Sequence, residues 1–260
     1  MQITNKVVII TGASSGIGAA AAQAFAAAGA RVVLAARDEA LLREVAATLP
    51  GRALVVPTDV AVPEQVAALV QRAVAEFGVI DILINNAGVG LASPVAALAS
   101  EALLKAMQVN LFGPLALTQA ALPFLRRSRG QVMFVSSVVG LRALPYLGGY
   151  AATKAALDRL SESLRVELQG SGVAVTLVRP GTTSSGFAAH RLGGGHERRK
   201  MNSSAATPEQ VAATLVRASV RRPRVAYVTR GDRLNIVFSL LAPKLADRLL
   251  GWAFEWEGEK

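Results

Sequence analysis

The sequence contains no cysteine and only two histidines. Without cysteine the chain can form no disulfide bond, thiolate nucleophile or cysteine-ligated metal site, so we expect a reducing, cytoplasmic location. His190 and His196 have no neighbours with the spacing of metal ligands, and we assign both to a surface or substrate loop and predict no metal site. The N-terminal residues enter an apolar segment without the features of a signal peptide, which favours the same location.

Acidic residues are also scarce, with 18 Asp and Glu against 28 Lys and Arg, which gives a formal net charge of +10. Ten of the basic residues and three of the acidic ones lie between residues 190 and 233, so the positive charge is concentrated in the last third of the chain. Charge by itself is weak support for nucleic-acid binding, and we predict no nucleic-acid partner.

Hydrophobic residues make up 52% of the chain, enough for a substantial buried core. Short aliphatic runs predict strands buried on both faces at residues 6–11, 31–36, 52–57, 80–85, 131–136 and 173–180, with a seventh near 224–229. Helical patterns lie at 16–29, 38–49, 63–77, 100–126, 150–169 and 207–220. This alternation predicts one α/β domain over residues 1–260, in which two helical layers enclose a doubly wound, mostly parallel, seven-stranded sheet. Residues 186–206 show no clear periodicity and are predicted to be a mobile loop.

A glycine-rich turn, TGASSGIG at residues 11–18, lies where the first predicted strand passes into the first helix. Gly12 permits a tight turn, Gly16 lets the backbone approach a pyrophosphate, and Gly18 lets the helix pack closely on the strand. Because the helix N-terminus faces the same point, the turn predicts a dinucleotide-binding site.

Four motifs follow one another along the chain: this glycine spacing, NNAG at 85–88, Ser137 followed by YAATK at 150–154, and RPG at 179–181. Over residues 5–185 the chain thereby resembles the short-chain dehydrogenase/reductase family. The resemblance implies a Rossmann-type fold and hydride transfer between a nicotinamide cofactor and a carbonyl/alcohol pair. Beyond residue 186 the resemblance no longer indicates function, and we expect the loop over residues 186–206 to cover the substrate.

Tyr150 and Lys154 lie four positions apart on one predicted helix, so the phenol and the ammonium can approach a common point. The resemblance implies that Tyr150 donates a proton to the substrate carbonyl, that Lys154 lowers the tyrosine pKa and binds the nicotinamide ribose, and that Ser137 polarises the carbonyl. Asn110 would hold a water in a proton relay, and Ser136 is interpreted as structural. One ammonium about 4 Å from the phenol is worth roughly 4 kcal/mol at an effective dielectric constant of about 20, nearly enough to bring the phenol pKa to neutrality.

The end of the second predicted strand indicates the choice of cofactor. NAD-preferring members of the family carry an acidic residue where this chain has Ala36, and the next residue here is Arg37, whose guanidinium can pair with a 2′-phosphate. We therefore predict NADP(H), with Ser14 near the phosphate and Asp38 as a partial neutraliser of Arg37. The full set of cofactor residues implied by the resemblance is Gly12, Ser14, Ser15, Gly16, Ile17, Gly18, Arg37, Asp59, Val60, Asn86, Ala87, Gly88, Tyr150, Lys154, Pro180, Gly181 and Thr183.

The substrate expected from the resemblance is a small-molecule ketone, aldehyde or alcohol, and Phe187 and Leu192 beside arginines suggest a lipophilic molecule with an anionic part. Two alternatives remain open. One is a 3-oxoacyl-thioester reductase that docks an acidic acyl carrier protein on its basic face, and the other is a non-catalytic NADP-binding regulator or scaffold. A homodimer or homotetramer is expected from the family.

Residues 233–260 extend beyond the family's common core. An apolar series runs from Leu234 to Ala242, Pro243 interrupts it, and a second series runs from Leu245 to Trp256. Neither piece has the ~20 uninterrupted apolar residues needed to span a bilayer. Three alternatives are open for this segment: a cover over the substrate pocket, a subunit interface, or a hairpin that makes peripheral contact with a membrane surface or a lipid.

Overall fold

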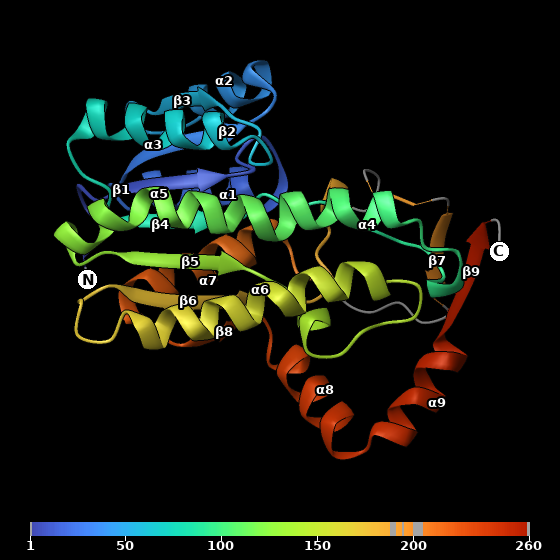
Figure 1. Cartoon of the computed structure of the whole chain (residues 1–260). Helices are drawn as coiled ribbons and strands as arrows, with labels where there is room; N and C mark the ends of the chain where they lie inside the picture. The colour runs from blue at the N-terminus through green and yellow to red at the C-terminus, as the bar shows by residue number, and fades with distance from the viewer. Residues whose placement is uncertain (1, 188–190, 194, 200–204, 259–260) are drawn as a thin grey trace.

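The computed structural model describes residues 2–187, 191–193, 195–199 and 205–258. Parallel strands form one sheet in the order β3-β2-β1-β4-β5-β6-β8 (Figure 1). Their bounds are β1 Val7–Thr11, β2 Arg31–Ala36, β3 Leu54–Pro57, β4 Ile82–Asn85, β5 Gln131–Val135, β6 Ala174–Arg179 and β8 Val225–Tyr227. The predicted three-layer, doubly wound fold with a seven-stranded parallel sheet is confirmed.

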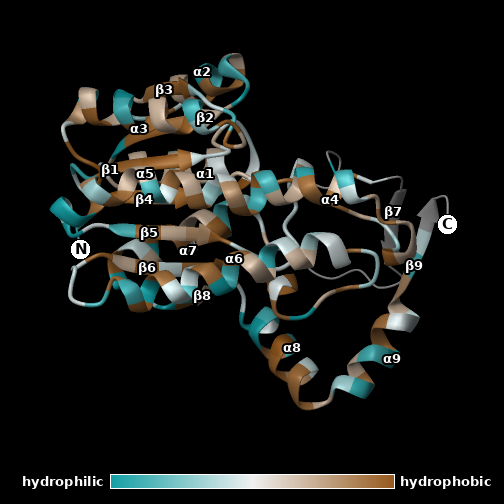
Figure 2. Ribbon diagram, in the orientation of Figure 1, coloured by the Kyte–Doolittle hydropathy of each residue, from teal (hydrophilic) through white to brown (hydrophobic). Residues whose placement is uncertain are grey.

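Helices cover both faces of this sheet (Figure 1). One layer contains α1 (Gly16–Ala27), α2 (Glu39–Ala47) and α7 (Pro208–Arg221). The other contains α3 (Pro63–Phe77), α5 (Gly113–Ser128) and α6 (Gly148–Glu167). Because neither face meets solvent, every residue of β1, β4 and β5 is buried, as their continuous aliphatic runs predict. Figure 2 shows β1 in brown, the colour of apolar residues.

The prediction of one regular helix over residues 100–126 is wrong at residues 108–112. The structure has α4 (Ser100–Met107), one turn of π-helix, η2 (Gln108–Phe112), and then α5. Pro114 explains the break, because it has no N–H to donate to the carbonyl of Asn110 and its ring would collide with that carbonyl in a regular α-helix. The wider π-turn changes the direction of the Asn110 side chain relative to a regular α-helix, and Asn110 is fully buried.

The last part of the chain adds elements outside the main sheet. Strand β7 (Gly195–Arg199) pairs antiparallel with β9 (Phe254–Gly258), while α8 (Arg230–Leu241) and α9 (Pro243–Ala253) form a projecting pair before β9 (Figure 1). The predicted loop over residues 186–206 is therefore wrong at residues 195–199, since the partner strand is supplied by the far end of the chain. His196 lies in β7, and His190 lies outside the described residues. Within the described residues, no helix is long and apolar enough to cross a membrane.

A buried ion pair fixes α6 against the sheet. Asp158 on α6 is fully buried and accepts hydrogen bonds from Arg179 Nη2 at 2.8 Å and Nε at 3.3 Å, and Arg179 at the end of β6 is only 4% exposed. The second carboxylate oxygen accepts a hydrogen bond from the Ser136 hydroxyl, directly after β5. Both charges are thus compensated by hydrogen bonds, which a buried ion pair requires. Ser136 is structural, as predicted.

We expect Asp158→Asn to lower the free energy of unfolding by roughly 3–5 kcal/mol, because it leaves the Arg179 guanidinium buried without a counter-charge. Urea denaturation followed by circular dichroism measures the loss. The matched control is Glu39→Gln, which removes an exposed carboxylate paired with Arg43 on α2 and should cost less than about 0.5 kcal/mol. Equal losses in the two variants would contradict the assigned role of the buried pair.

Candidate active site

The predicted site residues gather at the carboxyl edge of the parallel sheet. Each follows a strand: Gly12 after β1, Arg37 after β2, Asn86 after β4, Ser137 after β5 and Pro180 after β6. The strand order reverses between β1 and β4, and in doubly wound sheets ligands bind at such a switch point. The fold alone therefore brings together motifs from distant parts of the sequence.

The glycine-rich turn has the geometry that its sequence predicts. Gly12 and Gly16 have φ of 65° and 52°, which other residues rarely adopt. A Cβ on Gly18 would lie only 2.0 Å from the carbonyl oxygen of Gly12, so the first turn of α1 is pressed against the end of β1. Ser15 caps α1 without a side-chain capping hydrogen bond in the described structure, and its exposed hydroxyl stands with Ser14 and Ile17 at the helix N-terminus. These donors fit the pyrophosphate of a dinucleotide.

Thr11 is a residue that the sequence analysis missed. Its Oγ1 accepts hydrogen bonds from the backbone N–H groups of Asn86 and Ala87, both at 3.0 Å. In return, the Asn86 side chain donates to the carbonyl oxygen of Thr11 at 2.8 Å. The loop after β4 is thereby fixed to the glycine-rich turn. A threonine at the end of the first strand is the only local signal that could have indicated this role.

Strand β2 lies next to β1, on the side opposite β4. Directly after β2, Arg37 is exposed, and it follows the buried Ala36. The Asp38 carboxylate accepts a hydrogen bond from the Leu41 N–H at 3.0 Å and so caps α2. Asp59 follows β3, and its Oδ1 accepts a hydrogen bond from the Ala61 N–H at 2.9 Å. Val60, the next residue, is buried against Gly113. The four positions lie beside the strands where the adenine end of a dinucleotide is predicted.

Asn110 uses its whole amide to hold the loop after β4. Its Oδ1 accepts a hydrogen bond from the Val89 N–H, and its Nδ2 donates to the Val89 carbonyl and to the Thr153 hydroxyl, at distances of 2.8, 2.9 and 3.0 Å. Thr153, fully buried on α6, was not predicted as a site residue. A Cβ on Gly88 would lie 3.1 Å from Asn110 Oδ1 and 3.6 Å from Lys154 Nζ, so the loop, the π-turn and α6 meet at one point.

Lys154 is buried beneath Tyr150. Its Nζ donates a hydrogen bond to the carbonyl oxygen of Val135 at 3.0 Å and lies 5.8 Å from the centre of the Tyr150 ring. Burial lowers the pKa of Lys154 to about 8, and the Asp158 carboxylate one turn further along α6 opposes this by raising it. The ammonium is therefore mostly retained at neutral pH.

Tyr150 lies between Ser137 and the segment after β6. Burial raises the pKa of Tyr150 well above its ordinary value, and the Arg191 guanidinium and a hydrogen bond with Ser137 lower it only in part. Our expectation that Lys154 brings this pKa to neutrality is wrong for the chain by itself, because burial dominates. The Ser137 hydroxyl also donates to the Pro180 carbonyl at 3.4 Å.

Phe187, which was assigned from the sequence to the substrate loop together with neighbouring arginines, and Arg191 are neighbours of Tyr150. The rings of Phe187 and Tyr150 are 5.8 Å apart. A Cβ on Gly90 would lie 2.6 Å from Arg191 Cγ and 3.2 Å from the Phe187 ring, so both side chains cross the loop after β4 at a glycine. Backbone hydrogen bonds from Leu192 to Gly90 and from Ala92 to Leu192 hold the two segments together.

The loop after β6 closes the other side of the site. A Cβ on Gly181 would lie 2.1 Å from Asp232 Oδ1, so the start of α8 packs directly on this loop. Thr183 pairs with Ala206, and Ser185 lies against Gly16, 3.3 Å from the place of a Cβ there. The segment that contains Thr183 therefore reaches the glycine-rich turn.

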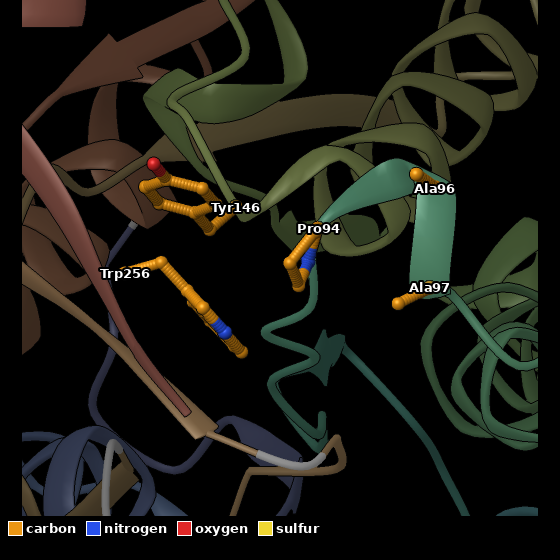
Figure 3. A pocket seen from close by; sticks show the side chains of 5 residues that line it. All are labelled: Pro94, Ala96, Ala97, Tyr146 and Trp256. Atoms are coloured by element: carbon orange, nitrogen blue, oxygen red, sulfur yellow. The ribbon is translucent and has the colours of Figure 1, made fainter. Parts of the chain in front are cut away.

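A pocket of about 380 Å³ has Tyr146, four residues before Tyr150, in its wall. Its wall consists of Pro94, Ala96, Ala97, Tyr146 and Trp256, and Figure 3 shows the two aromatic rings on one side and the smaller side chains on the other. The rings of Tyr146 and Trp256 are 5.3 Å apart. Trp256 comes from β9, so the last strand packs on the protein's own surface at Tyr146.

The geometry is that of a nucleotide-dependent oxidoreductase, and the comparisons agree. The profile of the short chain dehydrogenase family matches residues 6–192. A dehydrogenase/reductase SDR family protein 7-like of Anopheles gambiae is 34% identical over 94% of this chain and 78% of its own length. The protein belongs to the short-chain dehydrogenase/reductase family.

Two solved structures of the family show the same fold. A short-chain dehydrogenase/reductase from Burkholderia phymatum in complex with NAD has a TM-score of 0.85 and 26% identity, over 94% of this chain and 96% of that one. An alcohol dehydrogenase from Thermococcus sibiricus complexed with 5-hydroxy-NADP has a TM-score of 0.74 and 30% identity, over 85% of this chain and 94% of that one. Relatives thus bind nicotinamide nucleotides of both kinds. The individual roles of the site residues in this chain remain predictions.

The pKa of Lys154 predicts how stability depends on pH. The folded-state pKa of about 8 lies below the ordinary value of 10.5, so the unfolded chain binds more protons between these pH values and stability rises with pH there. Relative to Lys154→Met, the wild-type free energy of unfolding should gain roughly 1 kcal/mol per pH unit from pH 8 to 10. Urea denaturation of both proteins across this range provides the measurement. Parallel pH profiles would show that Lys154 titrates normally.

Proposed function

We propose that the protein is an NADP(H)-dependent reductase that transfers hydride to the carbonyl group of a lipophilic substrate. The observation that carries the proposal is the grouping of Ser137, Tyr150 and Lys154 at the carboxyl edge of the sheet, with Lys154 Nζ 5.8 Å from the centre of the Tyr150 ring. A hydroxyl, a phenol and an ammonium grouped in this way can polarise a carbonyl, protonate its oxygen and hold a ribose.

In the proposed reaction, the nicotinamide supplies the hydride when it is bound. Tyr150, hydrogen-bonded to Ser137, gives its phenolic proton to the substrate oxygen as negative charge develops there. Because burial disfavours the phenolate, the positive charges of Lys154 and Arg191 are needed to offset its cost when the proton leaves. Asn110 and Thr153 hold the loop and the helix on either side in register.

Three features around β2 support NADP(H) rather than NAD(H). Ala36 offers no carboxylate to the ribose hydroxyls, and the next side chain, Arg37, is exposed. The Asp38 carboxylate caps α2, so its hydrogen-bonding capacity is directed to the helix rather than to Arg37. An exposed guanidinium at this point is suited to a 2′-phosphate, which it can bind through two parallel hydrogen bonds.

The surroundings of Tyr150 support a lipophilic substrate with an anionic group. Phe187 contacts the Tyr150 ring, and the pocket at Tyr146, four residues before Tyr150, is lined by proline, alanine and aromatic side chains. The guanidinium of Arg191 is close enough to Tyr150 to influence its pKa. An apolar body would occupy the pocket while a carboxylate or phosphate contacts Arg191.

We expect Tyr150→Phe to reduce turnover about 10²–10⁴-fold while the affinity for NADPH is kept, because only the transferable proton is lost. The assay follows NADPH consumption over a panel of ketones, aldehydes and 3-oxoacyl thioesters, with cofactor binding measured by fluorescence. Tyr227→Phe at the end of β8 is the matched control and should retain wild-type turnover. Near-normal reduction by Tyr150→Phe would remove this residue from the mechanism. Tight NADPH binding by the wild type without turnover on any panel member would favour the non-catalytic regulator.

The wild type should bind NADPH more tightly than NADH, and Arg37→Ala should lose about 10–150-fold of that preference through the loss of a charge-assisted contact. Parallel titrations with the two cofactors give both values. Arg43→Ala, on the same side of the fold and paired with Glu39, should leave the preference unchanged. Equal affinities of the unmutated protein for NADPH and NADH would refute the assignment.

A further inference from the structure

The helix pair α8–α9 exposes apolar side chains that a helix in a globular protein normally buries. On α8, Leu234, Val237, Phe238 and Leu241 recur at i, i+3, i+4 and i+7, which places them on one stripe, and they are 67%, 44%, 40% and 81% exposed. Only Ile236 of this helix is buried. The apolar stripe of α8 therefore faces away from the core.

Helix α9 repeats the pattern. Leu245, Leu249 and Trp252 recur at i, i+4 and i+7 and are 49%, 48% and 57% exposed, while Ala246 is the buried residue of the helix. Figure 1 shows that the two helices project from the body as a V, and in Figure 2 the ribbon is brown, the colour of apolar residues, along much of α8 and around the elbow. Leu240 and Leu241 lie at this elbow, just before Pro243.

Basic side chains border the apolar stripes. Arg230 and Arg233 lie on the first turn of α8, and Lys244 and Arg248 lie on α9, all of them exposed. None of the four forms an ion pair with a carboxylate of the described residues. Both acidic residues of the pair are already engaged, since Asp232 accepts a hydrogen bond from Thr229 and Asp247 pairs with Arg142. The exposed charge available to a partner is therefore positive.

We propose that the α8–α9 elbow docks on an anionic phospholipid surface. Apolar stripes bordered by lysine and arginine are typical of helices that lie in the interface of a bilayer, where leucine and tryptophan enter the acyl boundary and basic residues face the headgroups. A projecting elbow suits a fluid surface, which deforms around it, whereas a rigid protein partner would need a matching hollow.

Docking would bring the substrate side of the protein to the lipid. Helix α9 passes directly into β9, where Trp256 walls the pocket beside Tyr146. The elbow and one wall of the pocket thus belong to one continuous segment. Attachment to lipid does not depend on the proposed reductase activity, so it can be tested whether or not a substrate is known.

The test is sedimentation of the full chain with phosphatidylcholine vesicles, with or without phosphatidylglycerol. We expect the wild type to pellet with the phosphatidylglycerol vesicles and the double variant Leu240→Ser, Leu241→Ser to bind them at least about tenfold more weakly, because two inserted side chains are lost. The double variant Lys244→Gln, Arg248→Gln should lose affinity for the anionic vesicles alone, and added salt should have the same effect.

The matched control is Leu104→Ser, Val220→Ser, which removes exposed apolar side chains from α4 and α7 and should bind vesicles as the wild type does. All four side chains exchanged in the two serine variants are exposed, so both variants are expected to fold, which circular dichroism verifies. The proposal is overturned if the wild type stays in the supernatant with anionic vesicles, or if both serine variants lose binding equally. It is also overturned if the elbow variant lowers the oligomeric mass in light scattering while vesicle binding is unchanged, since the elbow is then a subunit interface.

Discussion

The position of α6 against the sheet governs the site, and the buried contact of Asp158 with Arg179 sets that position. A carboxylate without exposure must have its charge compensated, and here both of its oxygens are used. The three groups belong to three segments: α6, the end of β6, and Ser136 at the end of β5. Ser136 precedes Ser137, and Arg179 precedes Pro180, so one carboxylate fixes the segments that carry the hydroxyl, the phenol and the closing loop.

The same carboxylate also affects the charge of the site. Burial lowers the pKa of Lys154 and raises that of Tyr150, so each side chain is driven toward its neutral form. Asp158 opposes this effect on Lys154, and Arg191 opposes it on Tyr150. The effect of burial on the two pKa values is thus opposed by two charges, that of Asp158 on α6 itself and that of Arg191 from the segment after β6.

Local patterns in the sequence predict the parallel sheet, most helices and the glycine-rich turn, because these depend on periodicity and on residues a few positions apart. Contacts between segments far apart in the sequence were harder to predict from such local patterns. The pairing of β7 with β9 joins residues 195–199 to 254–258, and nothing in either segment identifies the other. Thr11 and Thr153 matter through hydrogen bonds to Asn86 and Asn110, each more than forty positions away. The π-turn at Asn110 was missed because Pro114 was not weighed against the helical pattern.

Residues 233–260 were expected to have one of three roles, but the structure assigns different surroundings to different parts of this segment. Trp256 packs on Tyr146, whereas the stripes of α8 and α9 are exposed. The exposed pair is tied to the site at both ends: Asp232 at its start presses on Gly181, and β9 follows its last turn. Neither end is joined to the body through a long linker, so the helix pair is anchored at its start on the loop after β6 and at its end, through β9, on the pocket wall.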